Sequence, residues 1–130
     1  MKQVEVAAAI VMDEGEILCV QRGKNKLSYI SEKFEFPGGK IEEGESLKET
    51  VIRELKEELM LDVLPSKKLM TVQHQYPDFH LTMHAFICRC SNRNLKLTEH
   101  IGFKWLSPNK LSHLDWAAAD IPIVQQILNM

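Results

Sequence analysis

Cysteine is scarce in this sequence, and its scarcity excludes two kinds of protein. The three cysteines, Cys19, Cys88 and Cys90, are odd in number and lie inside apolar, strand-like stretches. Free thiols in a reducing compartment are therefore expected, rather than a disulfide-stabilised domain. Cys88-x-Cys90 has no second pair of Cys or His residues at zinc-binding spacing, so a zinc site is excluded as well.

Long apolar runs and basic clusters are also missing. No run approaches the ~20 apolar residues of a membrane helix, and the chain passes directly into strand-like sequence. No signal peptide and no membrane contact are therefore expected, and the protein should be cytoplasmic. The net charge of −2 and the lack of a basic cluster argue against a protein that binds the nucleic-acid backbone. An anionic small molecule remains compatible with this charge if metal ions link it to carboxylates.

What is present is the composition of an ordinary globular protein. The chain has 130 residues, of which 45% are hydrophobic and 26% are charged. It contains no repeat, low-complexity tract or linker. This length fits one domain, residues 1–130, with a core of its own, and a monomer or weak dimer is expected.

Apolar patterns between turn residues predict a set of short strands. They are expected at residues 4–11, 17–22, 34–36, 69–76, 81–90 and 102–106. The first two should form a hairpin around the turn chemistry at 13–16. Pro37 should stop the third strand, and Gly38-Gly39 should supply the backbone freedom of a turn.

Two helices are expected. In the first, residues 46–60, the apolar side chains that should face the core recur every four residues: Leu47, Val51, Leu55 and Leu59. In the second, residues 120–128, the residues expected to face inward are Ile123, Ile127 and Leu128. Strands and helices in this mixed order predict an α+β domain, with helices on the faces of a mixed sheet.

The first helix carries an unusual acidic cluster. Glu54, Glu57 and Glu58 are spaced so that they lie within roughly 100° of arc on the helix. Arg53 and Lys56 are expected to point elsewhere on the wheel, which would leave three carboxylates to repel one another. Spacing alone leaves two interpretations open: a solvated acidic face, or a site for a hard divalent cation such as Mg²⁺.

The residues around this cluster complete a longer pattern. From Gly39 the chain runs through five residues to Glu45 and through seven more to Arg53-Glu54-Leu55-Lys56-Glu57-Glu58. This resembles the Nudix box, G-x5-E-x7-R-E-U-x-E-E-x-G-U, where U is a bulky aliphatic residue. One position departs from it, because Met60 replaces the glycine that normally ends the helix, which questions the local C-cap geometry.

The resemblance covers nearly the whole chain and implies a fold and an activity. Residues 35–46, the first hairpin and the C-terminal tail are similar to the MutT and CTP pyrophosphohydrolase-like subfamily of Nudix hydrolases. The fold implied is the Nudix α/β/α sandwich with a mixed central sheet. The activity implied is hydrolysis of a nucleoside triphosphate to the monophosphate and pyrophosphate with Mg²⁺ or Mn²⁺. The substrates expected are of the CTP or dCTP type, or oxidised nucleotides such as 8-oxo-dGTP.

The resemblance also assigns catalytic and metal-binding roles to positions of this sequence. Glu54, Glu57 and Glu58 match the metal-binding glutamates. The turn at Gly38-Gly39 matches the place where a backbone carbonyl completes the metal shell.

Three further residues match positions of the catalytic machinery outside the metal-binding helix face. Arg53 and Glu45 match positions that orient the catalytic helix and loop through an ion pair. Glu99, six residues ahead of Trp105, matches a further catalytic and metal-binding glutamate downstream of the box; the alternative for Glu99 is an ordinary surface acid. The five histidines are expected to be structural or exposed.

The substrate-binding residues are less sharply indicated. Arg22 matches a position near the nucleotide, or is a solvated arginine at a strand end. The aromatic residues Phe36, Tyr76 and Phe79 would stack on a base or pack in the core. Asp120 matches a base-reading position, where an ionised carboxylate suits the exocyclic amine of cytosine, or it caps the last helix.

Other functions stay open at this point. One is hydrolysis of another nucleoside-diphosphate-linked substrate, such as a nucleotide sugar or a capped RNA end. The other is a non-catalytic nucleotide-binding module, although such modules have generally lost the box glutamates, and all of them are present here.

Overall fold

The computed structural model describes all 130 residues of the chain. Its strands are β1 (Lys2–Asp13), β2 (Glu16–Gln21), β3 (Phe34–Glu35), β4 (Gly38–Lys40), β5 (Val63–Gln75), β6 (Phe79–Cys90) and β7 (Gly102–Leu106). Its helices are α1 (Leu47–Leu59) and α2 (Ile121–Leu128), with short 3-10 helices at η1 (Pro108–His113) and η2 (Ala118–Asp120). The expected strands and helices are all present, while β4 and the two 3-10 helices were not foreseen.

Strand β1 is the centre of the sheet. Along one edge it pairs in parallel with β6, from Lys2 to Val11, and β6 pairs antiparallel with β5. Its other edge is shared, because β4 occupies Val6–Ala8 and β2 pairs only with Met12 and Asp13. The expected hairpin of the first two strands therefore exists only at its turn. Beyond that turn β2 leaves β1 and pairs with β3 and β7.

The stretch after Pro37 is a strand rather than the expected turn. Gly38 lies opposite Ala8 on β1, and a Cβ atom added to Gly38 would overlap the carbonyl oxygen of Ala7. A glycine is needed here because the backbones of β1 and β4 approach too closely for a side chain.

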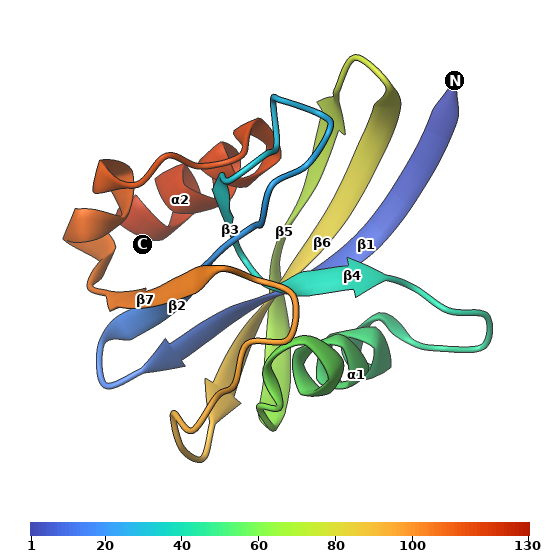
Figure 1. Ribbon diagram of the computed structural model, residues 1–130. Coiled ribbons are helices and arrows are strands. Elements are labelled where there is room, and N and C mark those ends of the chain that lie inside the picture. The colour runs from blue at the N-terminus through green and yellow to red at the C-terminus, as the bar shows by residue number, and fades with distance from the viewer.

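The helices cover opposite faces of the sheet, as Figure 1 shows with α1 and α2 separated by the strands. Alternate side chains of β1 enter two different cores. Ala7, Ala9 and Val11 pack with α1, whereas Ala8 and Ile10 pack with α2 and the segment before it. This two-sided burial of a mixed sheet confirms the expected α+β sandwich. No helix combines the length and the apolar character needed to cross a membrane.

Helix α1 begins and ends within one residue of the expected bounds, 46–60. Ser46 and Glu49 form a reciprocal capping box, and Val51, Leu55 and Leu59 of the apolar stripe are fully buried. In α2, Ile123 and Ile127 are buried as expected. Leu128 is 46% exposed, so its predicted inward orientation is wrong; it lies at the last residue of the helix, beside the chain terminus. The three cysteines are free, as expected.

Met60 at the end of α1 adopts the conformation that the Nudix-box glycine would supply. It is left-handed, with φ 52°, and its N–H donates to the carbonyl of Lys56, while the N–H of Leu61 donates to that of Leu55. The loss of glycine therefore leaves the C-cap geometry intact, at the steric cost of a side chain in the left-handed region.

Replacing Met60 with glycine is expected to stabilise the fold. The side chain is 54% exposed, so little packing is lost, and relief of left-handed strain should exceed the added entropy of the unfolded chain by about 0.5–1 kcal/mol. Urea unfolding measures the difference. Gly44→Ala is the matched opposite, since Gly44 has φ 83° and open space where a Cβ would lie, and it should destabilise by about 1 kcal/mol. A Met60→Gly variant less stable than the parent would contradict the inference that the left-handed conformation of Met60 is strained.

Candidate active site

A cavity of about 670 Å³ lies between α1, β4, the loop after β2, the β5–β6 turn and the segment that leads into α2. Most of the residues predicted to form the site line it. These are Arg22, Phe36, Gly38, Gly39, Glu54, Glu58, Phe79 and Asp120. Four others, namely Glu45, Arg53, Glu57 and Glu99, are not part of its wall. The carboxylates of α1 and the aromatic residues therefore face a single space, although they come from distant parts of the sequence.

Glu54 lies directly against the backbone of β4. A Cβ atom on Gly39 would overlap the carboxylate of Glu54, so glycine at this position allows the carboxylate to reach the strand. One oxygen, Oε1, accepts a hydrogen bond of 2.8 Å from Arg53. The other oxygen, Oε2, has no protein partner among the hydrogen bonds of the structure. Glycine at position 39 therefore allows β4 to pack closely against the acidic face of α1. This is separate from the metal-ligand role predicted for a backbone carbonyl at this position.

Glu58 is a partly buried residue with one carboxylate oxygen that is fully buried and unpaired. Its Oε1 atom is out of contact with solvent and makes no hydrogen bond. Burial raises the pKa of Glu58 from 4.5 to about 7; the ring of His100 opposes the shift, and the charges of Glu54, Glu35 and Glu99 add to it. A carboxylate in this state is costly for the folded protein unless a cation or a donor binds it.

Arg53 does not point away from the glutamates, so that part of the sequence interpretation is wrong. Its guanidinium donates to both oxygens of Glu45, at 2.6 and 3.0 Å, and to the Lys40 carbonyl at 2.9 Å. It also bonds Glu54 at 2.8 Å and Glu57 at 3.2 Å. The arginine side chain is long enough to bond Glu45 in the loop before the helix and Glu57 on the next helical turn, whatever the direction of its Cβ on the helical wheel.

The predicted ion pair between Arg53 and Glu45 is present and couples the loop after β4 to α1. Hydrogen bonds from Arg53 lower the pKa of Glu45 to about 2, with a further contribution from the Glu42 backbone N–H. Glu45 also accepts from the hydroxyl of Thr50 at 2.9 Å. With the bond from Arg53 to the Lys40 carbonyl, the backbone of β4 and the acidic face of α1 are thus held in a fixed relation.

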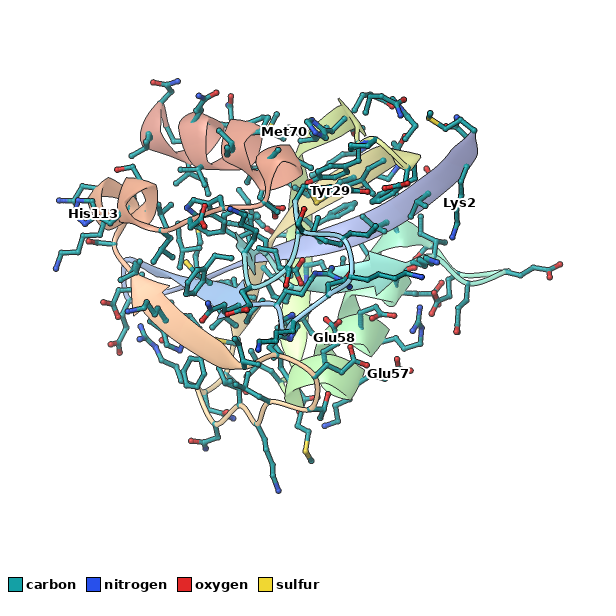
Figure 2. All side chains as sticks on the ribbon, turned by 45° about the horizontal axis from the view of Figure 1, so that its top comes forward. Lys2, Tyr29, Glu57, Glu58, Met70 and His113 are labelled. Carbon is teal, nitrogen blue, oxygen red and sulfur yellow. The ribbon has the colours of Figure 1, made fainter.

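The acidic residues of α1 do not form a ready-made cluster. Glu57 is exposed and turned to Arg53, while Glu58 lies on the cavity side of the same helix turn (Figure 2). No group of three His, Cys, Asp or Glu side chains converges closely enough to hold a metal ion. Glu99 is an exposed loop residue. The residues nevertheless suit Mg²⁺ or Mn²⁺, because the orphaned Oε1 of Glu58 and the free Oε2 of Glu54 are hard oxygen donors, and Mg²⁺ retains several waters.

Sequence reasoning missed a network of charged and polar side chains at the wall of the cavity. Glu35 accepts from Arg22 at 2.9 and 3.1 Å and from His100 Nε2 at 3.0 Å. The His100 side chain is 4% exposed and its Nδ1 has no partner, so His100 is not a surface residue. The pKa of Glu35 is lowered, since bonds from His100 and Arg22 outweigh its burial. Arg22 is therefore paired rather than freely solvated. Glu35 and His100 are 65 residues apart, a separation that no local pattern reveals.

The other end of the cavity is aromatic. Phe36 and Tyr76 are nearly fully buried and belong to the core, yet both also line the cavity with Phe79. Phe36 stacks on Trp116 with ring centres 4.7 Å apart. The two interpretations of these aromatic residues, core packing and cavity lining, therefore both hold.

Asp120 is not a helix cap. Its side chain makes no capping hydrogen bond at the start of α2; instead, its Oδ1 accepts from the N–H of Phe36 at 3.0 Å. The residue is 5% exposed, and burial, followed by the charge of Glu35, raises its pKa well above the usual range. The capping interpretation is wrong because Asp120 itself has helical backbone angles, which direct its side chain away from the helix N–H groups.

Comparison with known proteins gives a consistent result. A family model described as "NUDIX domain" matches residues 1–127. A CTP pyrophosphohydrolase of Escherichia coli is 32% identical over 98% of this chain and 93% of its own length. An 8-oxo-dGTP diphosphatase of the same organism is 28% identical over 98% of each chain. The crystal structure of a MutT protein from Methanosarcina mazei superposes with a TM-score of 0.87 and 26% identity, over 97% of this chain and 93% of that one.

Proposed function

The chain belongs to the Nudix family of hydrolases, and on that premise we propose that it is a single-domain nucleoside triphosphate pyrophosphohydrolase. Water would cleave the triphosphate to a nucleoside monophosphate and pyrophosphate. The observation that supports this most is the single cavity that Glu54 and Glu58 share with Phe36, Phe79 and Asp120. It offers carboxylates for a metal-bound phosphate chain and aromatic surfaces for a base, in one continuous space.

Members of this family need divalent metal ions, and we propose Mg²⁺ or Mn²⁺ here. Glu54 and Glu58 would hold the metal, together with the backbone near Gly38 and Gly39, and Glu57 and Glu99 would join them through water or after rearrangement. Bound metal supplies neutralisation of phosphoryl charge and a water of lowered pKa. Hydrolysis of a phosphoanhydride requires no covalent nucleophile from the protein.

The other charged residues of the site hold its parts in place. Arg53 would keep the catalytic carboxylates at a fixed distance from the β4 backbone through its bonds to Glu45, Glu54 and the Lys40 carbonyl. Such fixation reduces the reorganisation needed in the transition state. Arg22, held by Glu35, presents its remaining N–H groups to the cavity, where they suit a phosphate or the polar edge of a nucleotide.

For the base, we propose a preference for CTP-like nucleotides or oxidised nucleotides such as 8-oxo-dGTP. The two relatives from Escherichia coli are named for these two classes. One polar group near the aromatic residues is Asp120, whose Oδ1 accepts from the Phe36 N–H. Its second oxygen remains to contact a base, as an acceptor when ionised and as a donor when protonated.

A panel of triphosphates at equal concentration tests this function. We expect hydrolysis that needs Mg²⁺ or Mn²⁺, releases pyrophosphate, and is highest in kcat/KM for cytosine or oxidised guanine nucleotides. Undiminished turnover in excess EDTA would contradict the metal-dependent mechanism. Release of a sugar phosphate from nucleotide sugars, with no pyrophosphate from any triphosphate, would instead favour another Nudix substrate class. Binding without turnover would favour a non-catalytic module.

A further inference from the structure

The loop between β2 and β3 is closed at its neck by backbone hydrogen bonds, and it lines the cavity together with the aromatic residues. We call this part of the cavity, where a base would lie, the base end. Its neck is joined by the Arg22 N–H to the Lys33 carbonyl at 2.9 Å and by the Glu32 N–H to the Gly23 carbonyl at 3.3 Å. Inside it, the Asn25 N–H donates to the Ser31 hydroxyl at 2.9 Å. The loop is therefore stabilised by its own hydrogen bonds.

Tyr29 connects this loop to the β5–β6 turn. Its hydroxyl donates to the carboxylate of Asp78 in the β5–β6 turn, and this is the one hydrogen bond between the loop and that turn. Its ring stacks on Tyr76, with centres 5.2 Å apart and planes 20° from parallel. Figure 2 shows Tyr29 beside the strands, at the end of the sheet where this turn lies.

The contact extends inward through a row of rings. Tyr76 lies 5.1 Å from Phe79 between ring centres, and its hydroxyl accepts from the Ala119 N–H at 3.0 Å, next to Asp120. Tyr29 thus supports, from outside, the aromatic residues that line the cavity. Tyr29 itself is not part of the lining.

The two segments that Tyr29 joins line the same cavity. Lys26, Leu27 and Ile30 belong to the loop, Asp78 belongs to the turn, and Phe79 is the first residue of β6. If the Tyr29 hydrogen bond is lost, the loop keeps its neck but has no hydrogen bond to the β5–β6 turn. The position of the loop relative to the turn is then held by apolar packing alone.

We propose that Tyr29 is a positioning residue for the nucleoside: by bonding Asp78 and stacking on Tyr76 it holds the walls of the base end together around a bound base. The inference rests on the proposed nucleotide function. The phosphate end, formed by Glu54, Glu58 and β4, lies on elements that Tyr29 does not touch. Binding of the nucleoside should therefore depend on Tyr29, whereas binding of pyrophosphate should not.

The test compares the two reaction products as ligands of wild-type protein and of Tyr29→Phe. The substitution keeps the stack on Tyr76 and removes only the hydrogen bond to Asp78. The nucleoside monophosphate product of the best triphosphate should bind roughly 3–10-fold more weakly by calorimetry, the range of one hydrogen bond. The affinity of inorganic pyrophosphate with Mg²⁺ should stay within about twofold. In turnover, KM should rise by a similar factor, with kcat nearly unchanged.

Variants at Asp78 separate the bond from general effects on the fold. Asp78→Ala should weaken monophosphate binding as Tyr29→Phe does, and the double variant should be no weaker than either, because both remove one interaction. Asp78→Asn keeps an acceptor for the tyrosine hydroxyl and should retain most of the affinity. Equal monophosphate binding by wild type and Tyr29→Phe would overturn the proposal, as would additive losses in the double variant or equal losses of monophosphate and pyrophosphate. A wild-type protein that binds neither product would contradict the nucleotide function itself.

Discussion

Replacing Glu58 with glutamine is expected to reduce kcat by roughly two to four orders of magnitude while making the metal-free protein more stable. The loss of activity follows from removal of a charge that faces the cavity beside Glu54, since metal-assisted stabilisation of the transition state amounts to several kcal/mol and each 1.36 kcal/mol is about tenfold. Glutamine keeps the shape of the side chain. A fall in kcat therefore reports the charge rather than a cavity or a clash.

The gain in stability follows from the unpaired state of the same carboxylate. Its pKa in the folded protein is about 7, against 4.5 as the reference, so the folded protein holds a proton that the unfolded chain releases in this interval. Stability conferred by the protonated form is complete below pH 4.5, is lost as pH rises through about 7, and stays lost above it. Glutamine carries no such charge, so the variant should be more stable on the order of 1–3 kcal/mol at about pH 8 and about equal at pH 4.5.

Urea unfolding in EDTA at these two pH values measures the effect. Glu43→Gln is the matched control, because Glu43 is exposed on the loop before α1, and the same loss of charge there should alter neither kcat nor stability by a measurable amount. A Glu58→Gln enzyme with near-normal kcat would contradict a role of Glu58 in catalysis and favour the interpretation of the glutamates as a solvated acidic face. An equally stable variant at both pH values would contradict the buried, unpaired carboxylate.

The features of the fold that the sequence predicts are those set by local periodicity. Helix α1 was predictable to within one residue at each end, because its four-residue apolar spacing and its Ser46–Glu49 capping box are local properties. Strand β4 was not predictable in this way. Gly38 and Gly39 are strand residues only because β1, more than 25 residues earlier, offers an edge from Val6 to Ala8, and a glycine pair by itself indicates a turn.

The site divides along the same line. The acidic residues of α1 are visible as a motif within one helix, but the orientation of Arg53 depends on the carbonyl of Lys40 in β4 and on Glu45, which precedes the helix. The network of Glu35, Arg22 and His100 joins β3, the end of β2 and the loop before β7. The pairing of β2 with β3 and β7 brings these residues together. Their spacing along the sequence does not indicate this contact.

Replacing Asp120 with asparagine is expected to change which base is preferred without lowering stability. The asparagine carbonyl can accept the Phe36 N–H that Asp120 Oδ1 accepts now, at 3.0 Å, so the bond to the backbone just after β3 is kept. The buried carboxyl has a raised pKa, and an amide removes the cost of its charge at neutral pH. The stability of this variant should therefore equal or exceed that of the parent, for a reason unrelated to helix capping.

The change in preference follows from the group presented to the base. An ionised carboxylate accepts from the exocyclic amine of cytosine and donates nothing, whereas the amide adds a donor that suits the carbonyls of an oxidised purine. A well-placed polar contact contributes ~1–3 kcal/mol of discrimination, so the ratio of kcat/KM for dCTP over 8-oxo-dGTP should fall by about tenfold or more. Both substrates are measured side by side, so that any general loss of activity cancels in the ratio.

Asp120→Ala provides the contrast that separates base reading from support of the backbone. Alanine leaves the Phe36 N–H without its acceptor in a buried position, which should destabilise the protein by about 1–3 kcal/mol. If Asp120 only holds Phe36, the alanine variant loses activity on both nucleotides equally and the asparagine variant behaves as the parent. If Asp120 reads the base, the asparagine variant keeps its stability and changes its preference. If Asp120→Asn does not change the ratio of kcat/KM for dCTP over 8-oxo-dGTP, Asp120 does not read the base. Its role is then to hold the backbone of Phe36, and other groups of the cavity recognise the base.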